Sequence, residues 1–94
     1  MDNPITFRDK VLAFLYGHVH VSRDIHYGAP FEITQDGIAI ILGISRSHAS
    51  VVLGKMVSSG EVQCSAATIK DSERTNKRKI YLITPHGRAE FLER

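Results

Sequence analysis

Apolar residues near the start of the chain recur every three or four positions, the spacing that places them on one face of a helix. They are Phe7, Val11, Leu12, Phe14 and Leu15. This pattern predicts a helix over residues 4–16 that ends at Gly17. Pro4 suits the first turn of such a helix, and Asp2 or Asn3 can serve as its N-cap.

Two further helical patterns follow in the middle of the chain, joined by a short turn. The first begins after Thr34, whose hydroxyl can accept a hydrogen bond from an early backbone N–H, and ends at Gly43. Its apolar face is expected to hold Ile38, Ile41 and Leu42. The second begins after Ser45, ends at Gly60 and carries an apolar stripe at Ala49, Val52, Leu53, Met56 and Val57. Together they predict a helix-turn-helix over about residues 34–59.

Beyond the second of these helices the apolar period shortens to two, which is typical of strands. Residues 62–67 alternate in this way, and residues 80–83 form a second apolar run. A polar stretch separates them, so they predict a hairpin over about residues 61–83 with a charged tip. Thr84 and Pro85 then provide the N-cap and first residue of a short final helix.

These elements predict an α+β domain with a three-helix core, a two-stranded wing and a short C-terminal helix. The chain has 94 residues, of which 43% are hydrophobic, and it contains no internal repeat. This length and composition favour a single globular domain over residues 1–94.

Two segments resemble a known class of proteins. The first segment resembles the helix-turn-helix core of many prokaryotic winged-helix regulators and reads ITQDGIAIILGISRSHASVVLGKMVSSGEV. The second resembles their second wing strand and the helix that follows it, and reads KRKIYLITPHGRAEF. The similarity covers about residues 33–94 and is to the MarR-like group and to archaeal winged-helix proteins. It implies a winged helix-turn-helix that binds double-stranded DNA as a transcriptional regulator. Three positions depart from the pattern, namely Val51, Gly54 and Glu61.

The helix after Ser45 carries the first group of residues expected to contact DNA. A helix in the major groove reads base edges with its N-terminal residues. Arg46 can donate two hydrogen bonds to guanine, and Val51 can pack on a thymine methyl group. The other candidates on this helix are Ser45, Ser47, His48, Ser50 and Lys55. The alternative is that these residues are only the polar face of a surface helix.

The hairpin carries the second group of candidates, which are Arg74, Lys77, Arg78 and Lys79. Charge is uneven along the chain, with three basic and five acidic residues in the first 43 positions and nine and five in the rest. Such an asymmetry favours an anionic partner for one face. Wing contacts to phosphate or the minor groove would set affinity rather than sequence preference. A solvated hairpin tip, in which Asp71 and Glu73 oppose the basic groups, is the alternative.

The resemblance also implies a homodimer, because two recognition helices can then meet half-sites about one DNA turn apart. The first helix, together with the last, would supply the interface, with Phe7, Phe14, Tyr16 and Phe91 as candidates. These aromatic side chains can equally fill a small core. The main alternative function is a protein-interaction module, with the chain as the N-terminal domain of a longer protein. An exposed apolar patch would favour that alternative, and a continuous positive face would favour DNA.

Other chemistry finds little support in the sequence. His18 and His20 would share one face of an extended strand, but a zinc site needs further ligands and no cysteine lies nearby. Cys64 falls on the face of its strand that is expected to be buried, so we expect an inert core residue. No catalytic motif is present, and neither an enzyme nor a cofactor is expected. The absence of a secretory pattern or a long apolar run favours a cytoplasmic protein without membrane contact.

Overall fold

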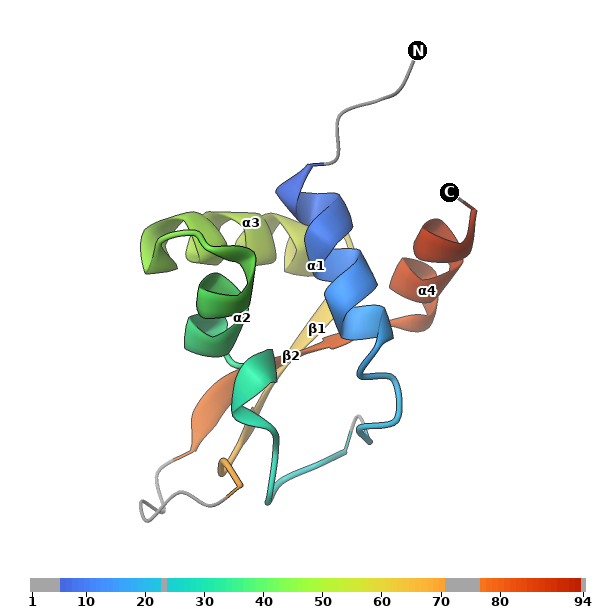
Figure 1. The fold of residues 1–94 in the computed structure, drawn as a ribbon. Coiled ribbons are helices and arrows are strands. Elements are labelled where there is room, and N and C mark those ends of the chain that lie inside the picture. The colour runs from blue at the N-terminus through green and yellow to red at the C-terminus, as the bar shows by residue number, and fades with distance from the viewer. Residues whose placement is uncertain (1–5, 23, 71–76, 94) are drawn as a thin grey trace.

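The computed structural model describes residues 6–22, 24–70 and 77–93. In chain order, the elements in these ranges are α1 (Phe7–Tyr16), η1 (Phe31–Ile33), α2 (Gln35–Leu42), α3 (Arg46–Ser58), β1 (Val62–Ala67), β2 (Arg78–Ile83) and α4 (Pro85–Leu92). Figure 1 shows α1, α2 and α3 grouped on one side of the hairpin formed by β1 and β2, with α4 beside α1. The α+β architecture predicted from the sequence is therefore confirmed.

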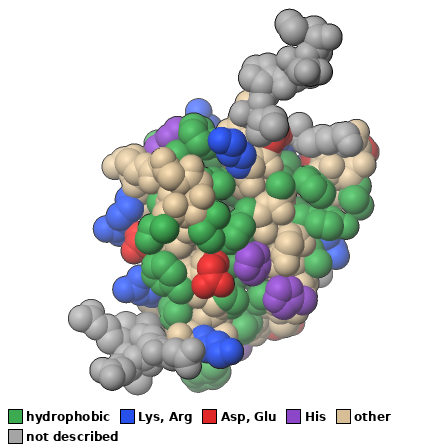
Figure 2. Space-filling model, in the orientation of Figure 1, with side chains coloured by type: hydrophobic (Ala, Val, Ile, Leu, Met, Phe, Trp, Pro, Cys, Tyr) green, Lys and Arg blue, Asp and Glu red, His purple; other side chains and the backbone are tan. Residues whose placement is uncertain are grey.

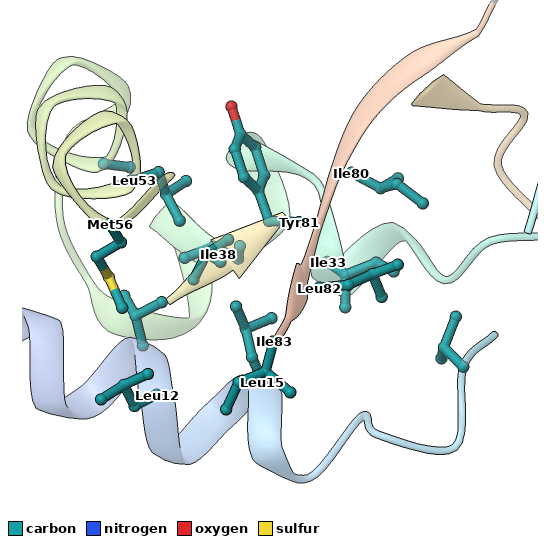
Figure 3. Packing of buried hydrophobic residues seen from close by; sticks show 14 of the residues in the cluster. Leu12, Leu15, Ile33, Ile38, Leu53, Met56, Ile80, Tyr81, Leu82 and Ile83 are labelled. Carbon is teal, nitrogen blue, oxygen red and sulfur yellow. The ribbon is translucent and has the colours of Figure 1, made fainter. Parts of the chain in front are cut away.

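The hydrophobic core lies between the three helices and the hairpin (Figure 3). Its largest fully buried side chains come from five elements and are Leu12, Leu15, Ile33, Ile38, Leu53, Met56, Ile80 and Val11. Burial of one large aliphatic side chain contributes about 1.5–3 kcal/mol. Because α3 contributes two of these side chains and the buried Ala49, its outer face is presented from a firmly packed helix.

The helix-turn-helix has the caps that the sequence predicted. The Thr34 hydroxyl accepts a hydrogen bond from the Gly37 N–H at 3.0 Å, and the Ser45 hydroxyl accepts one from the His48 N–H at 3.1 Å. Gly43 ends α2 with φ of 68°, a left-handed conformation that glycine adopts without a steric penalty. The chain therefore turns sharply and bends by 111° between α2 and α3.

The first helix starts later than predicted. Its N-cap is Thr6, whose hydroxyl accepts from the Asp9 N–H at 3.1 Å while the Asp9 carboxylate accepts from the Thr6 N–H at 3.3 Å. This reciprocal capping box satisfies two backbone donors and fixes the helix start at Phe7. The predicted start at Pro4, with Asp2 or Asn3 as cap, is therefore wrong, and residues 1–5 lie outside the described residues. The end at Gly17 is confirmed.

Three side chains predicted to be buried are exposed. Val57, near the end of α3, is 38% exposed, because α3 buries Leu53 and Met56 instead. Ile41 is 48% exposed, because α2 buries its Ile38 and Ala39 side and turns Ile41 toward the surface. Cys64 is also exposed, and β1 buries its two ends, Val62 and Ala67, instead of alternate residues. Next to the buried Ala67, the segment before η1 pairs with the chain through the Ala29 N–H, which donates to the Thr68 carbonyl at 3.0 Å.

The hairpin is tied to the helix-turn-helix by a backbone bridge. β1 and β2 pair antiparallel from Val62 opposite Ile83 to Ala67 opposite Arg78. On its other side, β2 forms an isolated antiparallel bridge between Ile80 and Thr34, the N-cap of α2. The start of β2 is therefore held beside the start of α2.

A partly buried ion pair joins α1 to the corner between α3 and β1. The Glu61 carboxylate is paired with Arg8, which donates from Nη2 to Oε2 and from Nε to Oε1, the latter at 3.0 Å. The Ser59 hydroxyl donates to the same carboxylate at 2.7 Å. Burial alone would raise the pKa of Glu61, but the hydrogen bonds from Arg8 and Ser59 and the Arg8 charge outweigh it and hold the pKa below its ordinary value.

Two glycines test the packing with opposite expected results. A Cβ on Gly37 would lie 2.2 Å from the Phe31 carbonyl oxygen, so Gly37→Ala should destabilise the protein by about 3 kcal/mol as the backbone is forced apart. A Cβ on Gly54, inside α3, would meet nothing within 4 Å. Gly54→Ala should therefore stabilise the protein by about 1 kcal/mol through helix propensity. Urea unfolding followed by circular dichroism measures both, and equal effects would contradict this packing.

The Glu61 ion pair predicts a loss of stability in acid. Because the folded-state pKa of Glu61 is lowered, its contribution is complete above the unfolded-state pKa of about 4.3 and disappears as the pH falls through the folded-state value. Glu61→Gln should lower the free energy of unfolding by about 2 kcal/mol at neutral pH, since Arg8 loses its charged partner. It should also flatten the pH dependence below about pH 4.3. The matched control is Glu93→Gln on the exposed end of α4, and an identical acid response in both variants would refute the role of Glu61.

Candidate nucleic-acid interface

The start of α3 presents the predicted reading residues to solvent. Ser45 is occupied in capping the helix, and Arg46 follows as its first residue with 76% of its side chain exposed. The other predicted residues on this helix are also exposed: Ser47, His48, Ser50, Val51 and Lys55. The helix is therefore open along its outer surface.

These residues lie on two sides of α3 rather than on one. Arg46, Ser47 and Ser50 line an open hollow together with Gln35 of α2. His48 and Lys55 line a different hollow, of about 400 Å³, between α3 and the start of α1. There the His48 ring meets the Phe7 ring edge to face, with centroids 4.6 Å apart. The structure therefore brings Arg46, Ser47 and Ser50 together, and it places His48 and Lys55 on another side of the helix.

The wing brings two of its predicted basic residues close to α3. Arg78 is the first residue of β2, Lys79 follows it, and Lys77 precedes it; all three are exposed. Arg74 lies outside the described residues. Arg78 and Lys79 line a hollow of about 390 Å³ whose other walls are Thr34, Gln35, Asp36 and Arg46. The start of α3 and the start of β2 thus border one continuous surface.

Asp36 lies at the centre of this surface, and the sequence reasoning did not single it out. Its Oδ1 lies 2.6 Å from Nε of Arg46, and its Oδ2 lies 3.6 Å from Nη1 of Arg78. Nearby, Gln35 Nε2 donates to the Arg46 carbonyl at 3.4 Å. Figure 2 shows Lys and Arg side chains along the edge of the molecule beside α2 and β2, with an acidic side chain between them. An acidic residue in the first turn of a helix is ordinarily explained by its favourable interaction with the helix dipole, so its sequence position does not reveal these contacts.

His18 and His20, in the connection between α1 and η1, are in ring contact but do not share one face of an extended strand, the geometry that the sequence predicts. His18 and His20 lie in turns rather than in an extended strand, and their rings stack with centroids 5.8 Å apart. His18 Nδ1 also lies 3.1 Å from the Phe14 carbonyl oxygen. Within the described residues, no group of three or more His, Cys, Asp or Glu side chains could hold a metal ion.

The aromatic residues considered for a dimer interface pack mainly within the domain. The Tyr16 and Phe91 rings join α1 to α4 with centroids 4.7 Å apart, and both side chains are half-buried against the core together with Phe14. Leu92, at the end of α4, is 64% exposed. None of the described helices alone is long and apolar enough to cross a membrane; α2 and α3 meet those criteria only when taken together across their bend.

Comparison with known proteins supports the fold. No protein-family model matches the chain, and no curated protein matches it in sequence. The chain is similar to two crystal structures of mutant MepR from a multidrug-resistant S. aureus clinical isolate, with 18% and 20% identity and TM-scores of 0.68 and 0.65. The likeness covers 94% and 93% of this chain but 52% of each MepR chain, so the chain spans about half of their length. These comparisons confirm the winged helix-turn-helix fold.

Proposed function

We propose that the chain binds double-stranded DNA as a transcriptional regulator, with α3 in the major groove and the wing on the sugar–phosphate backbone or in the minor groove. The observation that carries this proposal is the continuous surface on which the start of α3 meets the start of β2. Arg46, Arg78 and Lys79 border it from two elements far apart in the sequence. One duplex can therefore contact the recognition helix and the wing at the same time.

The two groups of residues would contribute different parts of the binding. Arg46, Ser47 and Ser50 lie at the N-terminal end of α3, the end that enters the major groove in this fold. Their hydrogen-bonding groups can read base edges, and Val51 beside them is 56% exposed and can meet a thymine methyl group. Lys77, Arg78 and Lys79 would neutralise phosphates, which supplies affinity that is the same for every sequence.

The protein would act as a homodimer, since two copies of α3 can then read half-sites about one turn of DNA apart. The exposed Leu92 at the end of α4 and the neighbouring Tyr16 and Phe91 support an interface on that side. This side is formed by α1 and α4, whereas the DNA surface is formed by α2, α3 and β2. Dimerisation and DNA binding therefore use different elements.

A protein-interaction module is a second candidate, and exposed apolar residues on α2 favour it. Ile40 is 70% exposed and Ile41 is 48% exposed, on adjacent positions of one helix. A contiguous patch of exposed apolar side chains can mark a site of contact with another protein. This surface and the DNA surface can both be used, so binding to duplex DNA is the measurement that separates the two candidates.

DNA binding should be strongly dependent on salt. In fluorescence anisotropy with a random-sequence duplex, the affinity should fall linearly on a logarithmic scale as salt rises, since each phosphate contact releases condensed cations. Lys77→Ala/Arg78→Ala should flatten the slope by about 2, because two phosphate contacts are removed. Arg46→Ala should weaken binding to a duplex selected for tight binding more than binding to the random duplex.

Arg88→Ala is the matched control, because it removes an exposed arginine from α4, away from the DNA surface. It should leave the slope of the random-duplex titration unchanged. Absence of binding by the unmodified protein even at low salt would refute the proposal and leave the protein-interaction module as the better candidate.

A further inference from the structure

We infer that Asp36 is a specificity-determining residue of the DNA-binding surface, where its carboxylate restrains Arg46 and Arg78 and lowers binding to arbitrary sequences. The inference deepens the proposed function and rests on it. It arises from an acidic side chain placed among the basic residues that would face DNA, a position in which an acid opposes phosphate binding.

The geometry ties three elements to one carboxylate. Asp36 stands in the first turn of α2, Arg46 begins α3, and Arg78 begins β2. Each oxygen of Asp36 has a different partner, with Arg46 Nε 2.6 Å from Oδ1 and Arg78 Nη1 3.6 Å from Oδ2. Asp36 therefore holds the recognition helix and the wing through their leading arginines.

Exposure shows which side of this cluster a ligand would meet. The Asp36 side chain is 31% exposed and its Oδ1 is shielded from solvent, whereas the side chains of Arg46 and Arg78 are 76% and 49% exposed. The carboxylate lies beneath the guanidinium groups, and the arginines form the outer layer. An approaching duplex would thus touch the arginines while the negative charge of Asp36 remains in place behind them.

The charge of Asp36 acts equally on every duplex. The hollow has three basic lining residues, Arg46, Arg78 and Lys79, and one acidic lining residue, Asp36. One carboxylate offsets one positive charge. The protein therefore loses the release of counterions that about one phosphate contact would give. Because phosphates are the same in every sequence, this loss falls on specific and non-specific binding alike.

The orientation imposed by Asp36 acts only where a base is read. Its ion pair with Arg46 is formed at Nε, 2.6 Å from Oδ1, so the contact does not require the two terminal Nη groups. These groups are able to form the paired hydrogen bonds with guanine O6 and N7. A side chain held in place by Nε loses less conformational entropy when it binds a guanine, so Asp36 favours the specific complex over others.

The test compares Asp36→Asn with the unmodified protein, using one random-sequence duplex and one duplex selected by the protein from a random pool. On the random duplex, Asp36→Asn should steepen the logarithmic salt slope by about 0.9 and raise affinity by about eightfold at 0.1 M salt. The selected duplex should gain the same charge effect but lose the ordering of Arg46. The ratio of the two affinities should therefore fall by about threefold or more.

Three further variants keep this result interpretable. Glu93→Gln makes the same change in net charge at the exposed end of α4 and should leave both the slope and the ratio unchanged. Asp36→Ser repeats the removal of the carboxylate with a shorter side chain, and thermal unfolding of each variant shows that it is folded. In an Arg46→Ala/Arg78→Ala background, Asp36→Asn should have less than half of its effect on the slope, because its two partners are gone.

The possible failures are distinguishable. If the unmodified protein binds duplex DNA but both Asp36 variants keep its salt slope, or improve its preference for the selected duplex, the inference about Asp36 is wrong and the proposed function stands. If the unmodified protein and the Asp36 variants all fail to bind DNA at low salt, both are wrong.

Discussion

The relation between the recognition helix and the wing depends on the surroundings of Thr34. This residue is 3% exposed, and its hydroxyl both accepts from the Gly37 N–H and donates to the Phe31 carbonyl at 2.7 Å. Its backbone forms the bridge to Ile80 of β2. One residue therefore caps α2, closes η1 and attaches the helix-turn-helix to the hairpin. Asp36 lies two residues after Thr34 and Arg78 two residues before Ile80, so this bridge holds the two segments that carry their ion pair beside each other.

Glu61 fixes the opposite end of the hairpin in a comparable way. Its carboxylate binds Arg8 of α1, its backbone N–H donates to the Met56 carbonyl at 3.0 Å, and its carbonyl accepts from the Thr84 N–H at 3.1 Å. Gly87 of α4 approaches so closely that an added Cβ would lie 2.2 Å from the same carbonyl. A charged residue at this position departs from the winged-helix pattern, and Arg8 is the compensation. Removal of one partner alone would leave a buried charge unpaired, which costs more than the pair itself provides.

Local signals in the sequence predicted the helix-turn-helix and the limits of β1 correctly, because caps and periodicity depend on residues close together in the chain. Thr34, Gly43 and Ser45 each act within three or four residues of themselves. The errors concern long-range packing. Alternation along β1 predicts that Cys64 is buried, whereas the buried side chains of this strand are those at its two ends, Val62 and Ala67. The two ion pairs of Asp36 likewise join residues that no spacing rule connects.

The arrangement of charge also bears on why a paired protein would bind better than a single one. The described surface offers four cations, Arg46, Lys77, Arg78 and Lys79, and Asp36 offsets about one of them. Proteins that bind DNA tightly make roughly 6–10 phosphate contacts. One copy of this surface falls short of that number, and two copies reach it. In the proposed dimer, an acid that weakens each half-site contact would make the affinity depend mainly on two half-sites being bound together.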